Sequence, residues 1–130
     1  MIVLDTHIWY WWAGDSPKLT SRQRELIEKA VPDGIGVSFI SCWEIAKKVQ
    51  IGKLELDRPV AEWLQFATAN PAVQVLPLTK EIAVESCQLP GQFHRDPADE
   101  LIVATSRILK IPLLTADAKI LGYPHVTILS

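Results

Sequence analysis

Four acidic residues lie at boundaries between expected strands and helices: Asp5, Glu44, Asp99 and Asp117. Carboxylates crowded at one place repel one another, and a divalent cation relieves that repulsion. Oxygen ligands without a cluster of Cys or His suit Mg²⁺ or Mn²⁺. Such an ion polarises a phosphoryl oxygen and lowers the pKa of a bound water. If the four acids converge in space, they predict metal-assisted hydrolysis of a phosphodiester bond.

Each acid also has an explanation that involves no ligand. A carboxylate near a helix N-terminus accepts backbone N–H groups and meets the positive end of the helix dipole. Pro97 suits the first position of a helix, which puts Asp96 at the N-cap and Asp99 in the first turn. Two roles therefore stay open for Asp96, a metal-facing acid or an N-cap alone. Its residue type favours the N-cap.

Short apolar segments alternate with amphipathic segments along the chain. The expected strands are residues 1–4, 35–40, 73–76, 112–115 and 126–129. The expected helices begin after Asp5, Thr20, Ser41, Asp57, Thr79, Asp96 and Asp117, with capping boxes at residues 20–23 and 41–44. This alternation predicts one α/β/α domain over residues 1–130, with a central parallel sheet of about five strands.

Strand order decides whether the acids meet. In open α/β sheets, ligands bind beyond the carboxyl ends of the strands, at the point where the strand order reverses. With the order 3-2-1-4-5, the ends of the first and fourth strands flank that point and the second strand lies beside it. Asp5, Glu44 and Asp117 would then converge, and the helix carrying Asp99 would lean over the same crevice.

Composition narrows the class of protein without identifying it. The net charge of −2 gives no long-range attraction for nucleic acid, so a phosphate-bearing substrate needs local basic residues or bound metal ions. No apolar run approaches the roughly 20 residues that span a bilayer, and the N-terminal segment lacks the basic start of a signal peptide. We therefore expect a cytoplasmic protein without a membrane anchor, in which Cys42 and Cys87 are free thiols.

Four segments, in chain order, carry a resemblance to a known family. They are VLDTHIWYWW at 3–12, SFISCWEIAKK at 38–48, HRDPADELIVATS at 94–106 and LLTADAKI at 113–120. Together they closely resemble the PIN-domain nucleases, and above all the VapC-type toxins of bacterial toxin–antitoxin pairs. The resemblance implies a three-layer, Rossmann-like PIN fold and a Mg²⁺- or Mn²⁺-dependent endoribonuclease. It also implies a homodimer inhibited by a small VapB-like antitoxin.

The resemblance also implies roles for individual residues. The catalytic, metal-holding acids of the family match Asp5, Glu44, Asp99 and Asp117, and its hydroxyl beside the first acid matches Thr6.

Other candidates rest on position alone. Thr115 is placed to orient Asp117 or a metal-bound water, although a Thr at a strand end is common without such a role. His94 and Arg95 either contact phosphate or form a solvated loop pair. Lys48, with Lys47, is a solvated helix face or a contact for the RNA backbone. Ala98 and Glu100 depart from the family pattern, which has a bulky residue and often a base there, so substrate contacts near the start of this helix are open.

Two other functions have to be weighed against a nuclease. A receiver-like signalling domain, with a metal-dependent phosphoacceptor Asp, shares the α/β architecture and an acidic pocket. It requires paired acids after the first strand and a Lys after the last, whereas this chain has Asp5-Thr6 and ends at Ser130. A PIN fold that is catalytically inactive and only binds a partner is the second alternative. The four retained acids argue against it.

Overall fold

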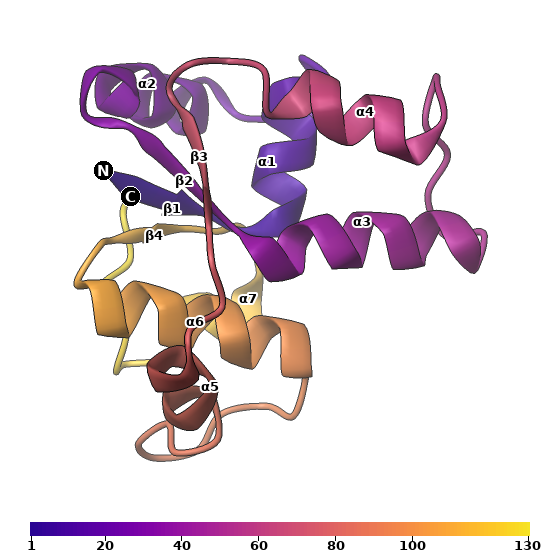
Figure 1. Cartoon of the computed structure of the whole chain (residues 1–130). Coiled ribbons are helices and arrows are strands. Elements are labelled where there is room, and N and C mark those ends of the chain that lie inside the picture. The colour runs from indigo at the N-terminus through magenta and orange to yellow at the C-terminus, as the bar shows by residue number, and fades with distance from the viewer.

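A parallel sheet forms the centre of the computed structural model, which describes residues 1–130 (Figure 1). Its strands are β1 (Ile2–Leu4), β2 (Ile35–Ser38), β3 (Val73–Leu76) and β4 (Leu113–Leu114). They pair in the order β3-β2-β1-β4, so the predicted order is confirmed for these four strands. The segment 126–129, predicted as the fifth strand, forms a single parallel bridge between Ile128 and Leu113.

Helices cover both faces of this sheet. They are α1 (Thr6–Ala13), α2 (Ser21–Ala30), α3 (Phe39–Gln50), α4 (Val60–Ala67), α5 (Lys80–Ser86), α6 (Pro97–Leu109) and α7 (Ala118–Leu121), with a 3₁₀ turn η1 (Val31–Asp33) before β2. Figure 1 shows α1, α2 and α4 on one side of the sheet and α5 and α6 on the other. The three-layer α/β/α architecture is therefore confirmed. None of the helices is long and apolar enough to cross a lipid bilayer.

The apolar core is divided by the sheet because successive strand residues point to opposite faces. Ile2 and Leu4 pack with Trp9 and the helices on one side. Val3, between them in the sequence, packs with Ile102 of α6 on the other. All of these side chains are at most 5% exposed, so β1 is enclosed on both faces. This burial holds the end of β1, and the acid that follows it, in a fixed position.

Most predicted helix starts are confirmed by their caps. Thr20 and Gln23 form the reciprocal capping box at the start of α2. Asp96 caps α6 and accepts the backbone N–H of Asp99 at 3.1 Å, with Pro97 in the first turn.

The predicted start of α3 at Ser41 is wrong. The helix begins at Phe39, because Ser38 turns its side chain back to accept the N–H of Ile40 at 3.2 Å. Strand β2 accordingly ends at Ser38, two residues before the predicted end. The shift moves Ser41 from the expected cap into the first turn, where it is fully buried.

Candidate active site

Asp5 is the most enclosed acid of the candidate site. It follows β1 directly, caps α1 and is 2% exposed. Its Oδ1 accepts the backbone N–H of Thr6 at 2.8 Å, and its Oδ2 accepts the hydroxyl of Thr115 at 2.6 Å. Because the neighbouring strands β1 and β4 end at the same edge of the sheet, the Thr115 hydroxyl reaches Asp5. The carboxylate is therefore held from both strands.

Glu44 is joined to the end of β1 through a chain of hydroxyls. Thr6 donates its hydroxyl proton to Glu44 Oε1 at 2.5 Å. The Ser41 hydroxyl lies 2.8 Å from the same Thr6 oxygen. Since the Thr6 proton is used on Glu44, Ser41 has to donate to Thr6. Lys48, one turn further along α3, lies 3.9 Å from Glu44 Oε2.

Asp99 enters the site from the first turn of α6 and is 15% exposed. The His94 Nε2 lies 2.6 Å from its Oδ2. Burial raises the pKa of Asp99 to about 6, and the negative charges of Asp5 and Asp96 act in the same direction. Burial likewise raises the pKa of Glu44, again with Asp5 and Asp96 adding to the effect. The charge of Asp5, at the end of β1, therefore acts on both Glu44 of α3 and Asp99 of α6.

Asp117 lies at the margin of this group. Its carboxylate caps the short helix α7 and accepts the N–H of Lys119 at 2.8 Å. Its own N–H is donated to the Thr115 hydroxyl at 3.0 Å. The Thr115 hydroxyl thus connects the backbone N–H of Asp117 to the side-chain carboxylate of Asp5. The structure places Asp117 next to the site while its carboxylate serves a helix end.

The remaining sequence candidates differ in their surroundings. Asp96 is exposed at the helix cap, yet its charge acts on both Glu44 and Asp99. His94 belongs to the site through Asp99, whereas Arg95 is exposed and makes no hydrogen bond or ion pair. Lys48 reaches the site through Glu44.

Two contributors were outside the set of candidates derived from the sequence. The Ser-x-x-Glu spacing predicts Ser41 as a helix cap, and the same spacing places its hydroxyl one turn before Glu44. His7 accepts the N–H of Ala116 through Nε2 at 3.1 Å, so its ring proton sits on Nδ1, 3.7 Å from Asp5 Oδ2. Only the fold brings His7 to the loop after β4.

The chemistry of these donors fits a hard divalent cation. The carboxylates supply oxygen atoms only, as Mg²⁺ and Mn²⁺ prefer. Burial raises the pKa values of Glu44 and Asp99, and the negative charges of Asp5 and Asp96 add to that effect. In the hydrogen-bonded arrangement described above, no three His, Cys, Asp or Glu side chains lie close enough together to hold one ion. Binding an ion would therefore exchange hydrogen bonds of these carboxylates for coordination.

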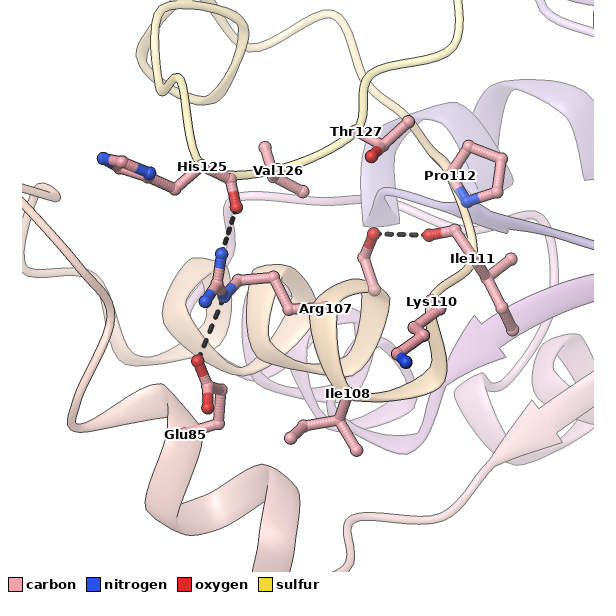
Figure 2. Close-up of a pocket in the computed structure, with 10 residues that line it drawn as sticks. Glu85, Arg107, Ile108, Lys110, Ile111, Pro112, His125, Val126 and Thr127 are labelled. Carbon is pink, nitrogen blue, oxygen red and sulfur yellow. Dashed lines mark hydrogen bonds and ion pairs between the residues drawn. The ribbon is translucent and has the colours of Figure 1, made fainter.

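A separate cavity of about 330 Å³ lies at the opposite end of α6 (Figure 2). There Arg107 donates to Glu85 Oε1 of α5 at 3.0 Å and to the backbone carbonyl of His125. These bonds tie α5, α6 and the C-terminal segment together. The guanidinium of Arg107 is bonded on both sides, so this residue has a structural role. The cavity shares no residue with the acidic site.

Comparisons with known proteins show the family and the fold. The family model described as "PIN domain" matches residues 2–125. The chain belongs to the PIN domain family. This PIN domain is 32% identical over 124 residues to Ribonuclease VapC22 of Mycobacterium tuberculosis (strain ATCC 25618 / H37Rv). The match covers 95% of this chain and 92% of the relative.

Solved structures share the same fold at low sequence identity. VapBC2 from Rickettsia felis, bound to a DNA fragment from its promoter, matches with a TM-score of 0.71 at 14% identity, over 99% of this chain and 98% of that chain. DNA-bound VapBC from Salmonella typhimurium matches with a TM-score of 0.71 at 16% identity, over the same shares. The PIN domain expected from the sequence motifs is confirmed.

Proposed function

We propose that this PIN domain is a metal-dependent endoribonuclease toxin that hydrolyses RNA phosphodiester bonds. The observation that carries the proposal is that the charge of Asp5, at the end of β1, acts on the carboxylates of both Glu44 of α3 and Asp99 of α6. The 32% identity to a ribonuclease over nearly the whole chain supports it independently.

Asp5, Glu44 and Asp99 are the proposed ligands of one Mg²⁺ or Mn²⁺, and Asp117 the proposed ligand of a second ion or the group that orients water. Such an ion supplies Lewis acidity toward a phosphoryl oxygen and a more acidic water. The chain itself supplies rigidity: Thr115 and the start of α1 hold Asp5, and Thr6 holds Glu44. Asp96 contributes negative charge and caps α6.

Basic side chains beside the acids would receive the phosphate groups. His94 contacts Asp99 and Lys48 lies near Glu44, so both stand next to the proposed reacting phosphate. Arg95 is exposed and unpaired in the adjoining loop and is free to contact a neighbouring phosphate. These few cations are needed because the whole chain carries a charge of −2.

An antitoxin of the VapB type is the proposed protein partner, and two copies of the toxin are expected to pair. Support for the antitoxin comes from the structures with this fold, which are VapBC complexes from Rickettsia felis and Salmonella typhimurium. The homodimer rests on the family resemblance. An RNA substrate would place the activity in the cytoplasm.

Cleavage of total RNA by the purified protein tests the proposal directly. The wild type should give discrete fragments with Mn²⁺ and none with EDTA. Asp5→Asn should reduce cleavage by more than about a hundredfold, the upper range for groups that only support a metal ligand, while Asn still caps α1. Asp33→Asn, an exposed acid on η1, is the matched control and should cleave normally.

Equal cleavage by wild type and Asp5→Asn would overturn the assignment. A folded wild type without any cleavage would favour the protein-binding module, and labelling of Asp5 by acetyl phosphate would favour the phosphoacceptor.

A further inference from the structure

A histidine at the start of α1 bonds to the loop that carries Asp117. His7 is the second residue of α1, and its Nε2 accepts the backbone N–H of Ala116 at 3.1 Å. Ala116 lies between Asp117 and Thr115, whose hydroxyl donates to Asp5. The bond joins two segments that are 109 residues apart in the sequence. It therefore ties the first turn of α1 to the loop after β4.

The loop after β4 has few other ties to this part of the site. Strand β4 spans only Leu113–Leu114, so its pairing with β1 ends before the loop begins. Beyond that point, residues 115–117 donate two hydrogen bonds to the β1–α1 segment, one to the Asp5 carboxylate and one to the His7 ring. The bond to His7 holds the backbone directly before Asp117.

The His7 ring is fixed on a second side by an aromatic neighbour. Its centroid lies 5.1 Å from that of the Trp11 ring, one turn further along α1. Trp11 is half-buried and packs against the larger apolar core. The His7 Nδ1 lies 3.7 Å from Asp5 Oδ2, which is too long for a hydrogen bond. The backbone amide of Ala116 is therefore the hydrogen-bonding partner of this ring.

We propose that His7 is a positioning residue, which sets the place of the Asp117 carboxylate relative to Asp5 by accepting the Ala116 N–H. This inference rests on the proposed ribonuclease activity and deepens it by assigning a support to the fourth acid. Asp117 is the proposed ligand of a second ion or the group that orients water. A displacement of about 1 Å in such a group can lower the rate about a hundredfold. The ring acts through the loop and does not itself contact the phosphate.

Two substitutions separate this role from simple packing against Trp11. His7→Phe keeps an aromatic ring beside Trp11 and removes the hydrogen-bond acceptor. His7→Gln loses the ring, but its amide oxygen is as many bonds from Cβ as the His Nε2 is, so it can accept the same N–H. A positioning role therefore predicts that Gln replaces His7 better than Phe does. A packing role predicts the reverse order.

The test compares both variants with wild type in the full chain. His125→Phe and His125→Gln are the matched controls, because His125 is exposed at the opposite end of α6 (Figure 2) and its side chain makes no hydrogen bond or ion pair. Exchange of the Ala116 amide hydrogen, followed by NMR in EDTA, measures the bond without metal or activity. Cleavage with Mn²⁺ of an RNA oligonucleotide, taken from a site found in total RNA, gives kcat and KM. Urea unfolding gives the folded fraction.

His7→Phe should speed exchange of the Ala116 amide hydrogen about two- to tenfold, from the usual contribution of one hydrogen bond. It should lower kcat about 10- to 100-fold, as loss of a group that holds a metal ligand does, and leave KM unchanged. His7→Gln should restore both the exchange rate and kcat, and the His125 variants should match wild type. His7→Leu, which also lacks an acceptor, replaces His7→Phe in the test if that variant does not fold.

Normal kcat in folded His7→Phe would overturn the positioning role of His7 and leave the ribonuclease standing. A larger loss of kcat in His7→Gln than in His7→Phe would also overturn it, because the ring would then act by packing against Trp11. Unchanged exchange of the Ala116 amide hydrogen in His7→Phe would overturn the role of the hydrogen bond itself. A folded wild type that does not cleave RNA would overturn the proposed function, and the positioning role with it.

Discussion

Replacing Asp99 with Asn is expected to stabilise the metal-free protein at neutral pH while abolishing cleavage. The reason is the position of this carboxylate, which is 15% exposed and stands near the charges of Asp5 and Asp96. Its pKa is raised from 3.8 to about 6, so the folded state resists its ionisation. Asn keeps the shape and an oxygen for His94 and removes the charge.

The magnitude follows from the size of that shift. A change of about two pH units corresponds to roughly 3 kcal/mol at 1.36 kcal/mol per unit. Solvent screening of the partly solvated group reduces this by about half. Loss of a negative charge in the first turn of α6 costs roughly 0.3–1 kcal/mol of helix-dipole stabilisation. The net expectation is that Asp99→Asn unfolds with a free energy about 1 kcal/mol higher than wild type at pH 7.5.

The pH dependence of stability independently predicts the direction of this change in the free energy of unfolding. Because the pKa of Asp99 is higher in the folded state, the folded protein binds this proton more tightly than the unfolded chain. The wild type therefore carries no penalty below about pH 4, loses stability as the pH rises from 3.8 to about 6, and carries the full penalty above that range. The advantage of Asp99→Asn should disappear as the pH falls through the same window.

Urea unfolding in EDTA, followed by tryptophan fluorescence, measures the stability difference between Asp99→Asn and wild type. Comparing pH 7.5 with pH 4 measures its pH dependence. Glu100→Gln, at the next position of the same helix turn, is the control for loss of a first-turn acid. Addition of Mn²⁺ should stabilise wild type and remove the advantage of Asp99→Asn. An Asp99→Asn protein that is less stable than wild type at pH 7.5 would refute the explanation by burial and neighbouring charge. A difference in stability that is equal at both pH values would refute it as well.

Two further substitutions separate the site from its supports. Thr115→Val removes the hydroxyl that donates to Asp5 Oδ2. Groups that hold metal ligands in place usually contribute this much, so cleavage should fall about 10- to 100-fold and Thr115→Ser should restore it. Normal cleavage by a folded Thr115→Val would show that Asp5 does not need this hydrogen bond. Arg107→Met leaves Glu85 without its ion pair. The free energy of unfolding should fall by about 1–3 kcal/mol, and cleavage per folded molecule should be unchanged. A loss of activity in a protein of normal stability would contradict the purely structural role of Arg107.

Several elements could be predicted because their causes are local. Thr20 with Gln23, and Asp96 with Pro97, place the starts of α2 and α6 through side-chain and backbone bonds that span three residues or fewer. The start of α3 could not be fixed in this way. Ser38 and Ser41 are both competent caps, and only the end of strand β2 decided for Ser38.

The local pattern of residues also did not determine whether the predicted fifth strand forms. The apolar pattern of residues 126–129 predicts a strand, and one bridge from Ile128 to Leu113 forms. β4 itself spans only Leu113–Leu114, so little edge remains for a further strand to extend along.

The sequence by itself determined the family, the alternation of strands and helices, and the types of side chain that could hold a cation, because these depend on residue identity and spacing along the chain. The tertiary structure decided which of those side chains meet. It brought Thr115 onto Asp5 and Thr6 onto Glu44, and it left the carboxylate of Asp117 on a helix end. The physical reason is that hydrogen bonds and charge coupling act over a few ångströms, and these distances exist only after the parallel strands have aligned their carboxyl ends.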